Sequence, residues 1–390
     1  MGSNREYMHI AYLTPEYPHP KLSHSAGIGT SIKNLAQALA EKGHEITVFV
    51  CSQSQEAVFK EGKIEIHAIT HQKYKMGGFY FYRKFLQKYI NKVILEKEIQ
   101  LIEAPDWTGI TAFMKFQIPL VIKLHGTDAY FCQLEGRPQK WKNYYFEKRA
   151  LKNVDALISV SQFTANQTAK LFGIQTHIEV IPNFMDTDVF KPLNKEIVPF
   201  QLLYFGTLIR KKGILELAEI FNRVVEKEPR ATLVLLGNDV VDIKLNKSTL
   251  NLFQERLSKV AKTKVKHLPS VPYEKIKEYL AAANVVVLPS LAEAFPMTWL
   301  EAMAMEKAIV TSNIGWAKEL MLNGQTGYMV SPYEHENFAE KIICLLQNQQ
   351  LVKEMGKKAR QQIVTHFSKE IISDKNISYY QSILKNKFEL

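Results

Sequence analysis

The chain alternates short apolar runs with amphipathic segments along its length. His9–Leu13 is a largely apolar run typical of a buried strand, and Ser31–Lys42 carries its apolar residues at helical spacing. Strands that alternate with helices predict a parallel sheet with helices on both faces. Further strands are predicted in this half at 45–50, 63–69, 101–103, 120–124, 156–160 and 178–181.

The pattern lapses between residues 182 and 199, where Lys191–Lys195 has the composition of a linker. A second series then begins. Its helix is predicted at Ile214–Lys227, and its strands at 201–205, 232–236, 264–267, 284–288, 308–311 and 327–330.

We therefore predict an α/β protein with two tandem Rossmann-like domains that face each other across a cleft. The predicted domains are residues 1–193 and 194–370, and a last helix at 371–390 is expected to cross back to the first domain. A length of 390 residues agrees with this division, because it exceeds one ordinary core.

Composition indicates a globular protein in a reducing compartment. Hydrophobic residues make up 46% and charged residues 23% of the chain, and no segment approaches the roughly 20 apolar residues of a membrane span. The N-terminus lacks the apolar core of a signal peptide. Three cysteines, widely spaced and odd in number, argue against a disulfide framework or a zinc site. We expect a soluble cytoplasmic protein.

A formal charge of +11 favours anionic partners. Two segments, 73–92 and 140–146, are unusually basic and aromatic. They predict either a peripheral position on the anionic inner face of a membrane or an ordinary domain surface with solvated lysines. No recognised nucleic-acid-binding module accompanies them, so no nucleic-acid partner is expected.

The segment Leu288–Ala304 carries the most specific chemistry. Glu293 follows a buried strand, and Glu301, eight positions later, lies in the next helix, whose first turn suits Pro296. Ligands of open α/β sheets bind outside the carboxyl ends of strands. Two carboxylates on either side of a helix N-terminus suit a ligand with many hydroxyl groups.

Two strand-to-helix loops suit phosphate. The first, at residues 25–30, contains two glycines that let a ligand approach the backbone. The second, Gly206–Gly213, contains Arg210, Lys211 and Lys212, whose charges pair well with phosphate oxygens. A structural turn and a solvated basic loop are the alternatives for each taken alone.

Polar and aromatic residues follow other strands of the first half. His125 ends the strand at 120–124, and Asp106, Trp107 and Asp128 occupy comparable strand ends. There a hydroxylated acceptor would meet an aromatic platform and a carboxylate. Helix capping is an alternative use of the two aspartates.

Taken together, these residues resemble the GT-B glycosyltransferases, specifically the retaining family 4, also called group 1. The resemblance spans nearly the whole chain. It rests on the motifs Ala26–Thr30, His125–Asp128, Ile181–Asn183, Gly206–Gly213, Glu293–Glu301 and Asn323–Gly327.

The resemblance implies a nucleotide-sugar donor held mainly by the second domain. Glu293 would bind the sugar hydroxyls, Glu301 the ribose, and Lys212 the diphosphate. His125 would lie beside the reacting sugar, which makes His125, Glu293 and Lys212 the catalytic candidates. Further donor contacts would come from Gly27, Gly206, Arg210, Val271, Phe295, Pro296, Met297 and Thr298.

The implied reaction moves a hexose, with retention, from a nucleoside-diphosphate sugar such as a UDP-sugar to a hydroxyl group. The acceptor would be a glycan, a lipid-linked molecule or a small molecule, as in polysaccharide biosynthesis, with Asp106, Trp107 and Asp128 nearby. No metal or cofactor is implied. Two departures from the family pattern are Thr207, where an Arg is usual, and Ala26, where a glycine is usual.

Other classes fit less well or remain open. An NAD-dependent oxidoreductase would need GxGxxG and an acidic residue after the second strand, and Val48–Cys51 supplies none. A non-catalytic nucleotide-sugar-binding subunit, a phosphorylase and an epimerase remain alternatives.

Overall fold

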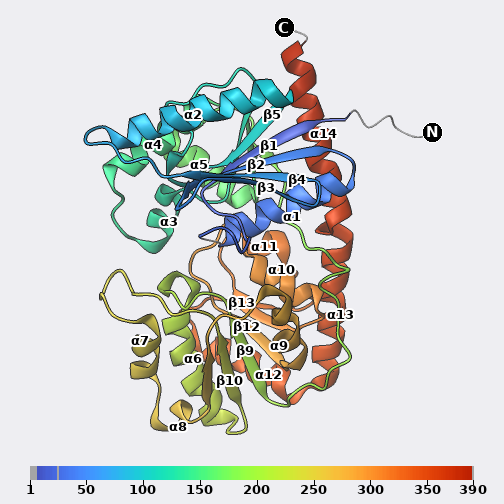
Figure 1. Ribbon diagram of the computed structural model, residues 1–390. Coiled ribbons are helices and arrows are strands. Elements are labelled where there is room, and N and C mark those ends of the chain that lie inside the picture. The colour runs from blue at the N-terminus through green and yellow to red at the C-terminus, as the bar shows by residue number, and fades with distance from the viewer. Residues whose placement is uncertain (1–6, 24–25, 389–390) are drawn as a thin grey trace, which may run out of the picture. The chain divides into compact units, whose positions relative to one another are not determined.

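The structure, a computed structural model, describes residues 7–23 and 26–388. Its contacts divide the chain into unit 1, Met1–Asn183 with Lys369–Leu390, and unit 2, Phe184–Ser368. Each unit is a sheet with helices packed on it (Figure 1), so the predicted α/β class is confirmed. The last helix, predicted at 371–390, belongs to unit 1.

The segment 184–193, which the sequence analysis assigned to the first domain, lies in unit 2. The Met185 N–H donates to the Phe367 carbonyl oxygen at 2.9 Å. The Arg360 guanidinium donates to the Phe190 carbonyl oxygen at 3.0 Å. These hydrogen bonds attach the chain to unit 2 about ten residues before the domain boundary that was predicted from the linker-like composition.

Unit 1 contains an eight-stranded sheet of order β3-β4-β2-β1-β5-β6-β7-β8. Its strands are β1 (His9–Thr14), β2 (Glu45–Gln53), β3 (Ala57–Glu61), β4 (Ile64–Thr70), β5 (Leu101–Pro105), β6 (Leu120–Leu124), β7 (Ala156–Ser159) and β8 (Glu179–Val180). Its helices are α1 (Gly27–Glu41), α2 (Gly78–Lys97), η1 (Trp107–Gly109), α3 (Asp128–Glu135), α4 (Trp141–Lys152), α5 (Gln162–Phe172) and α14 (Lys369–Phe388).

The sheet is parallel as predicted except at one edge. Strand β3 pairs antiparallel with β4 across the short turn at Gly62 and Lys63. None of the five β3 side chains is fully buried, so the strand lacks the apolar run by which the others were found.

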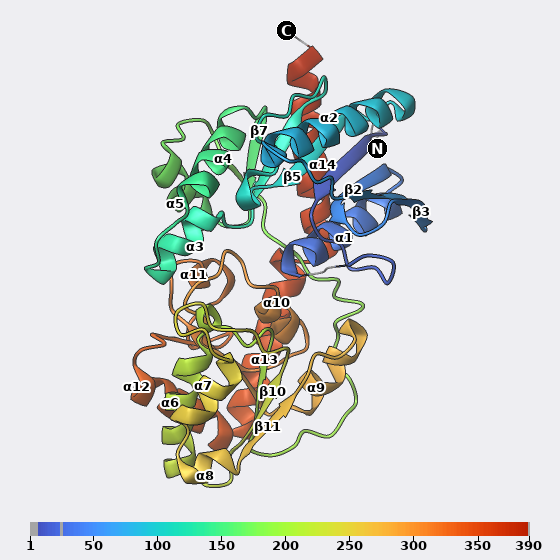
Figure 2. The same ribbon diagram turned by 60° about the vertical axis from the view of Figure 1, so that its left-hand side comes forward.

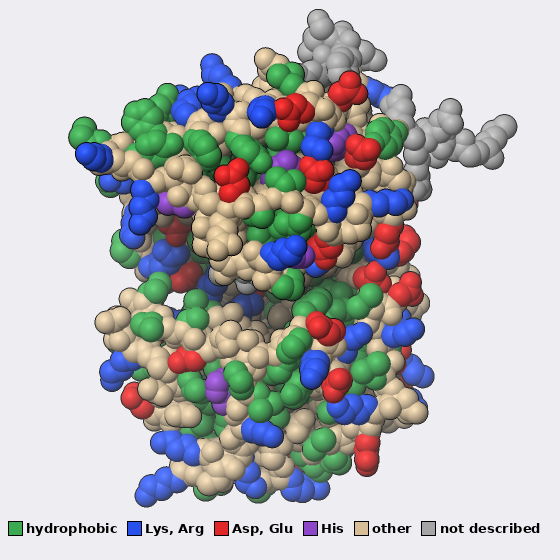
Figure 3. Space-filling view, viewed as in Figure 1, with side chains coloured by type: hydrophobic (Ala, Val, Ile, Leu, Met, Phe, Trp, Pro, Cys, Tyr) green, Lys and Arg blue, Asp and Glu red, His purple; other side chains and the backbone are tan. Residues whose placement is uncertain are grey.

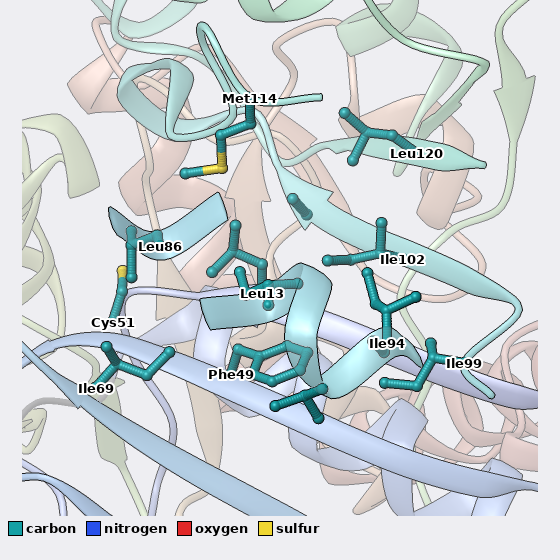
Figure 4. Close-up of a cluster of buried hydrophobic side chains, with 14 of the residues drawn as sticks. Leu13, Phe49, Cys51, Ile69, Leu86, Ile94, Ile99, Ile102, Met114 and Leu120 are labelled. Atoms are coloured by element: carbon teal, nitrogen blue, oxygen red, sulfur yellow. The ribbon is translucent and has the colours of Figure 1, made fainter. Parts of the chain in front are cut away.

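The unit 1 core lies between the sheet and α2. Leu86 and Ile94 of α2 belong to one buried cluster with Leu13, Phe49 and Ile102 of the strands (Figure 4). Successive side chains of a strand point to opposite faces. Tyr12, next to Leu13, therefore points away from α2.

On that other face, a buried polar group anchors α14. The Tyr380 hydroxyl donates to Glu103 Oε2 at 2.6 Å and lies 3.5 Å from the Tyr12 hydroxyl. Glu103 is 2% exposed, and burial raises its pKa. Lys123 on the neighbouring strand is also buried, and burial lowers its pKa.

Unit 2 contains a fully parallel sheet of order β11-β10-β9-β12-β13-β14 (Figure 1, Figure 2). Its strands are β9 (Gln201–Phe205), β10 (Thr232–Leu236), β11 (Val265–Leu268), β12 (Val285–Leu288), β13 (Ile309–Ser312) and β14 (Tyr328–Val330). Its helices are η2 (Arg210–Lys212), α6 (Ile214–Lys227), α7 (Thr249–Arg256), α8 (Lys259–Lys262), η3 (Tyr273–Lys275), α9 (Ile276–Ala282), α10 (Met297–Ala304), α11 (Ala317–Leu320), α12 (His335–Gln347) and α13 (Gln349–His366).

This strand order is that of a Rossmann fold, and the direction of succession reverses between β9 and β12. The fold therefore leaves a place for a ligand at that point.

We expect Tyr380→Phe to lower the free energy of unfolding of unit 1 by about 1–3 kcal/mol, because buried Glu103 loses its donor. Urea unfolding followed by circular dichroism measures the change. Tyr379→Phe is the matched control, since its hydroxyl donates at 3.4 Å to the Leu157 carbonyl oxygen from a partly exposed position. Equal losses in the two variants would show that the buried pair has no special role.

Candidate functional site

Two loops meet at the strand-order reversal of unit 2. The N–H groups of Leu291 and Ala292, after β12, donate to the Lys211 carbonyl oxygen at 2.8 and 3.1 Å. Gly213 has φ +70°, and a Cβ there would lie 1.8 Å from the Pro289 carbonyl oxygen. Glycine is therefore required, and the loops after β9 and β12 pack in backbone contact.

This contact brings together two predicted site residues. Lys212 Nζ lies 2.9 Å from Glu293 Oε1, although the residues are 81 positions apart. The Ser290 hydroxyl donates to the same carboxylate oxygen at 3.2 Å. The two charged side chains are 21% and 12% exposed, so solvent weakens their attraction less than at an open surface.

The second predicted carboxylate, Glu301, is 4% exposed on α10. Burial raises its pKa to about 7, against the opposing effects of the Tyr273 hydroxyl and the Lys212 charge. The Tyr273 hydroxyl donates to Glu301 Oε1 at 2.8 Å. Lys212 therefore pairs with Glu293 directly and acts on Glu301 through space.

Tyr273 was not among the residues predicted from sequence. Its hydrogen bond shows that the turn after β11, which contains Val271, reaches α10. Adjacency to Val271 in this turn was the available signal. Ser290, three residues before Glu293, was also missed, because serine is common in loops and so gives no specific signal.

The start of α10 offers backbone donors. Pro296 is the residue before the helix rather than part of its first turn, and no side chain caps it. The first N–H groups of a helix, here from Met297 and Thr298, lack partners within the helix. Gly206 lies close by, because a Cβ there would be 3.7 Å from Lys212 Cδ and 3.8 Å from Thr298 Cγ2. The Phe295 ring is buried and packs against Phe367.

Arg210 has a different partner from Lys212. Its Nε and Nη2 contact Asp242 at 2.6 and 3.0 Å. The guanidinium holds the pKa of the Asp242 carboxyl below its usual value, and Asp242 also accepts the N–H groups of Lys244 and Leu245. The structure thus places Arg210 in a bidentate ion pair with Asp242 of the loop after β10, and Lys212 beside Glu293.

In unit 1, hydrogen bonds to Asp106 fix the loop that contains His125. The Asp106 carboxyl accepts the N–H of His125 at 3.0 Å and that of Gly126 at 3.1 Å. Asp106 is 1% exposed, and burial raises its pKa to about 8. Burial and nearby Lys123 lower the pKa of partly exposed His125 to about 3, so its imidazole is neutral.

Asp128, predicted near an acceptor, is also mostly buried. Its carboxylate receives hydrogen bonds from Arg137 at 3.0 Å and from Asn143 at 2.9 Å. Glu147 of α4, which sequence reasoning missed, accepts the N–H groups of Asp128 and Ala129 at the start of α3. Both predicted aspartates are therefore engaged in holding loops.

The remaining predicted residues of unit 1 are more accessible. Trp107 is partly exposed and packs edge-on against Phe131. Gly27 begins α1 and is exposed, with open space where a Cβ would be. The Gly29 N–H donates to Glu16 Oε1 at 2.7 Å. Residues 24–25, where the predicted loop starts, lie outside the described residues.

Two absences hold for the described part of the chain. No group of three or more His, Cys, Asp or Glu side chains is arranged to hold a metal ion. No helix there has the length and apolarity needed to cross a membrane.

Two family models cover most of the chain. The model of Glycosyltransferase Family 4 matches residues 25–189, and that of Glycosyl transferases group 1 matches residues 185–362. Together with the two-unit fold, these matches show that the chain belongs to the GT-B glycosyltransferases of family 4.

Proteins with several different activities match this chain over nearly its whole length. N-acetyl-alpha-D-glucosaminyl L-malate synthase of Bacillus anthracis is 24% identical over 95% of this chain and 97% of its own. Sucrose-phosphate synthase of Thermosynechococcus elongatus has a TM-score of 0.81 at 19% identity, covering 97% of this chain and all of that one. HepE of Anabaena, solved with UDP-glucose, has a TM-score of 0.73 at 20% identity, covering 96% and 100%.

We expect Asp106→Ala to lower the free energy of unfolding of unit 1 by about 1–3 kcal/mol for each N–H it leaves without an acceptor. Urea unfolding measures this change. Replacement of exposed Glu56 by Ala serves as the control, with an expected effect within about 0.5 kcal/mol. A loss for Asp106→Ala as small as the control's would mean that the His125 loop does not depend on this carboxyl group.

Proposed function

We propose that this chain is a retaining hexosyltransferase that moves a sugar from a nucleoside-diphosphate sugar to a hydroxyl of a glycan, lipid-linked or small-molecule acceptor. The observation that carries this proposal is the pairing of Lys212 with Glu293 at the strand-order reversal of unit 2, where the charge of Lys212 also acts on buried Glu301. HepE, a protein of the same fold, binds UDP and UDP-glucose, which supports a UDP-sugar as the donor.

Each part of the donor has a chemical counterpart in unit 2. The carboxylate of Glu301 accepts hydrogen bonds from the ribose hydroxyls, and the turn with Val271 and Tyr273 lies along the nucleoside. Lys212, Gly206 and the N-terminus of α10 face the diphosphate. Glu293 accepts hydrogen bonds from the sugar hydroxyls.

Transfer breaks the bond between the anomeric carbon and the phosphate oxygen and forms one to the acceptor oxygen. Negative charge grows on the leaving diphosphate, where Lys212 and the α10 N–H groups stabilise it. The acceptor proton passes to that phosphate as the new bond forms on the same face. Neutral His125 is suited to donate or accept a hydrogen bond near the sugar, and no metal or cofactor enters these steps.

The acceptor would meet unit 1. Asp106 and Asp128 hold the loops after β5 and β6, and Trp107 presents a ring beside them. An aromatic face of this kind suits the apolar side of a sugar ring. We assign these aspartates to the positioning of the loops and Trp107 to acceptor contact.

Thermal-shift measurements with UDP-, GDP- and ADP-sugars test the donor, because a ligand stabilises the fold that binds it. We expect one nucleotide series to raise the Tm, and Lys212→Met to weaken its binding by about 1.5–3 kcal/mol, or roughly 10- to 150-fold. Lys211→Met removes the same charge one position away and is expected to change the affinity less than threefold.

Equal losses in these two variants would contradict the assignment of Lys212. Stabilisation by a nucleotide sugar, without release of nucleoside diphosphate in the presence of any hydroxylated acceptor, would identify a binding subunit instead.

The pKa of about 7 at Glu301 predicts a pH-dependent affinity for the donor. Ribose hydroxyls donate to the ionised carboxylate, so binding favours loss of its proton. Affinity is therefore expected to rise about five- to tenfold from pH 6 to pH 8. Calorimetry with a nucleotide sugar measures this, since the diester diphosphate has no titration in that range. Glu301→Gln should flatten the profile, and an unchanged profile in this variant would exclude Glu301 as its source.

A further inference from the structure

Exposed aromatic and apolar side chains gather on unit 1 where α2 begins near α4. Met76 is 83% exposed, Trp141 is 72%, and Phe79 and Phe81 are each 50%. Figure 3 shows hydrophobic side chains beside Lys and Arg side chains over the part of unit 1 where Figure 1 places α2 and α4. We call this surface the aromatic face and define it by Met76, Phe79, Tyr80, Phe81, Trp141 and Tyr145.

Ring contacts join the two helices into one surface. Phe79 of α2 packs against Phe146 of α4, with ring centroids 5.1 Å apart. Phe113 lies between Tyr80 and Tyr145, at 5.4 and 6.2 Å. The two segments that stand far apart in the sequence therefore present their aromatic rings together.

The same two segments hold nearly all of the excess charge of the chain. Residues 73–92 contain six Lys or Arg and no acid, and residues 140–152 contain five and a single Glu, for a formal +10 of the total +11. That Glu147 is fully buried. Among the described residues, Lys92 is the member of this group that pairs with a carboxylate, Glu96, at 3.6 Å.

A cavity of about 330 Å³ opens between the two helices beside Tyr80. Lys84, Lys115 and Arg149 supply its cationic wall, and Tyr80, Phe113 and Phe116 its aromatic wall. Asp155 also lines it, with Oδ2 accepting the Leu120 N–H at 2.8 Å. The Arg149 guanidinium lies 4.7 Å from the Phe113 ring centroid and pairs with no carboxylate in the described structure.

We propose that the aromatic face docks on an anionic lipid membrane, with the phosphate of a lipid headgroup in the cavity beside Arg149 and Lys115. Aromatic rings surrounded by cations suit the headgroup region of a bilayer, because the rings enter the interface while the cations pair with lipid phosphates. Met76 and Phe81 are exposed beside these cations, and exposure of apolar groups is costly in water but favourable in lipid.

The chemistry favours a membrane over nucleic acid as the occupant. Cations bind a phosphate backbone and aromatic rings can stack on bases, but Met76, which is 83% exposed on this face, has no base-stacking surface and gains by entering lipid. Helix α2, which carries Phe79 and Phe81, is fixed to the unit 1 core because its Tyr82, Leu86 and Ile90 are buried there. This proposal does not depend on the donor chemistry of unit 2.

Flotation with vesicles tests the proposal on the 390-residue chain. We expect it to float with phosphatidylcholine vesicles that contain 40% phosphatidylglycerol at 50 mM salt, and not with pure phosphatidylcholine. Met76→Ser with Trp141→Ser, and separately Lys75→Glu with Lys142→Glu, should each lower the bound fraction at least tenfold. Arg149→Gln should weaken binding of a soluble short-chain phosphatidylglycerol at least fivefold.

A matched control reverses the same charge on α13 of unit 2, with Lys353→Glu and Lys357→Glu, which are exposed. It should bind vesicles within twofold of the parent chain. All variants should retain their circular dichroism and the thermal shift given by the nucleotide sugar, which separates this proposal from that of the donor site.

Absence of flotation at low salt would overturn the proposal. An equal loss of vesicle binding in the α13 control would show that the net charge of the chain, and not the aromatic face, determines binding. Binding that survives Met76→Ser with Trp141→Ser, while single-stranded DNA binds the parent chain and not the charge-reversed one, would identify a general polyanion surface instead.

Discussion

The carbonyl oxygen of Pro289 occupies the place where a Cβ of residue 213 would lie, so two loops of unit 2 are in backbone contact. Hydrogen bonds from Leu291 and Ala292 to Lys211 reinforce that contact. The consequence is chemical, because Lys212 on one loop then meets Glu293 on the other. The absence of a side chain at Gly213 therefore allows Lys212 to reach the carboxylate of Glu293.

In unit 1, buried acids order the loops at the strand ends. Asp106 accepts two N–H groups beside His125, and Glu147 accepts two at the start of α3. Each acid takes donors that would otherwise be unsatisfied away from water. Neutral His125 is therefore presented on a loop that these acids, rather than a ligand, keep in place.

The cations of the chain lie in two different environments. Lys212 acts singly, beside carboxylates and partly shielded from solvent. The cations of α2 and α4 lie on an open surface, where each contributes little alone, so under the membrane proposal their sum would set the attraction to anionic lipid. Net charge by itself does not distinguish these uses, because it says nothing about burial or neighbours.

Local sequence predicted most of the fold because apolar spacing reports which residues are buried. Helix α6 begins and ends at the predicted residues, Ile214 and Lys227. Helix α1 begins at Gly27, four residues before its prediction, since glycines carry no periodic signal. Strand β3 was missed because its exposed edge has no apolar run.

The sequence alone also determined which chemistry was available: two acids eight positions apart, a cationic loop and a histidine at a strand end. Tertiary structure decided how each is used. It pairs Lys212 with Glu293 and Arg210 with Asp242. It also brings the Tyr273 hydroxyl to Glu301 and buries Asp106 where it accepts the N–H of His125. Those partners lie up to 81 positions apart, so the order of strands in the sheet, and not local spacing, brings them together.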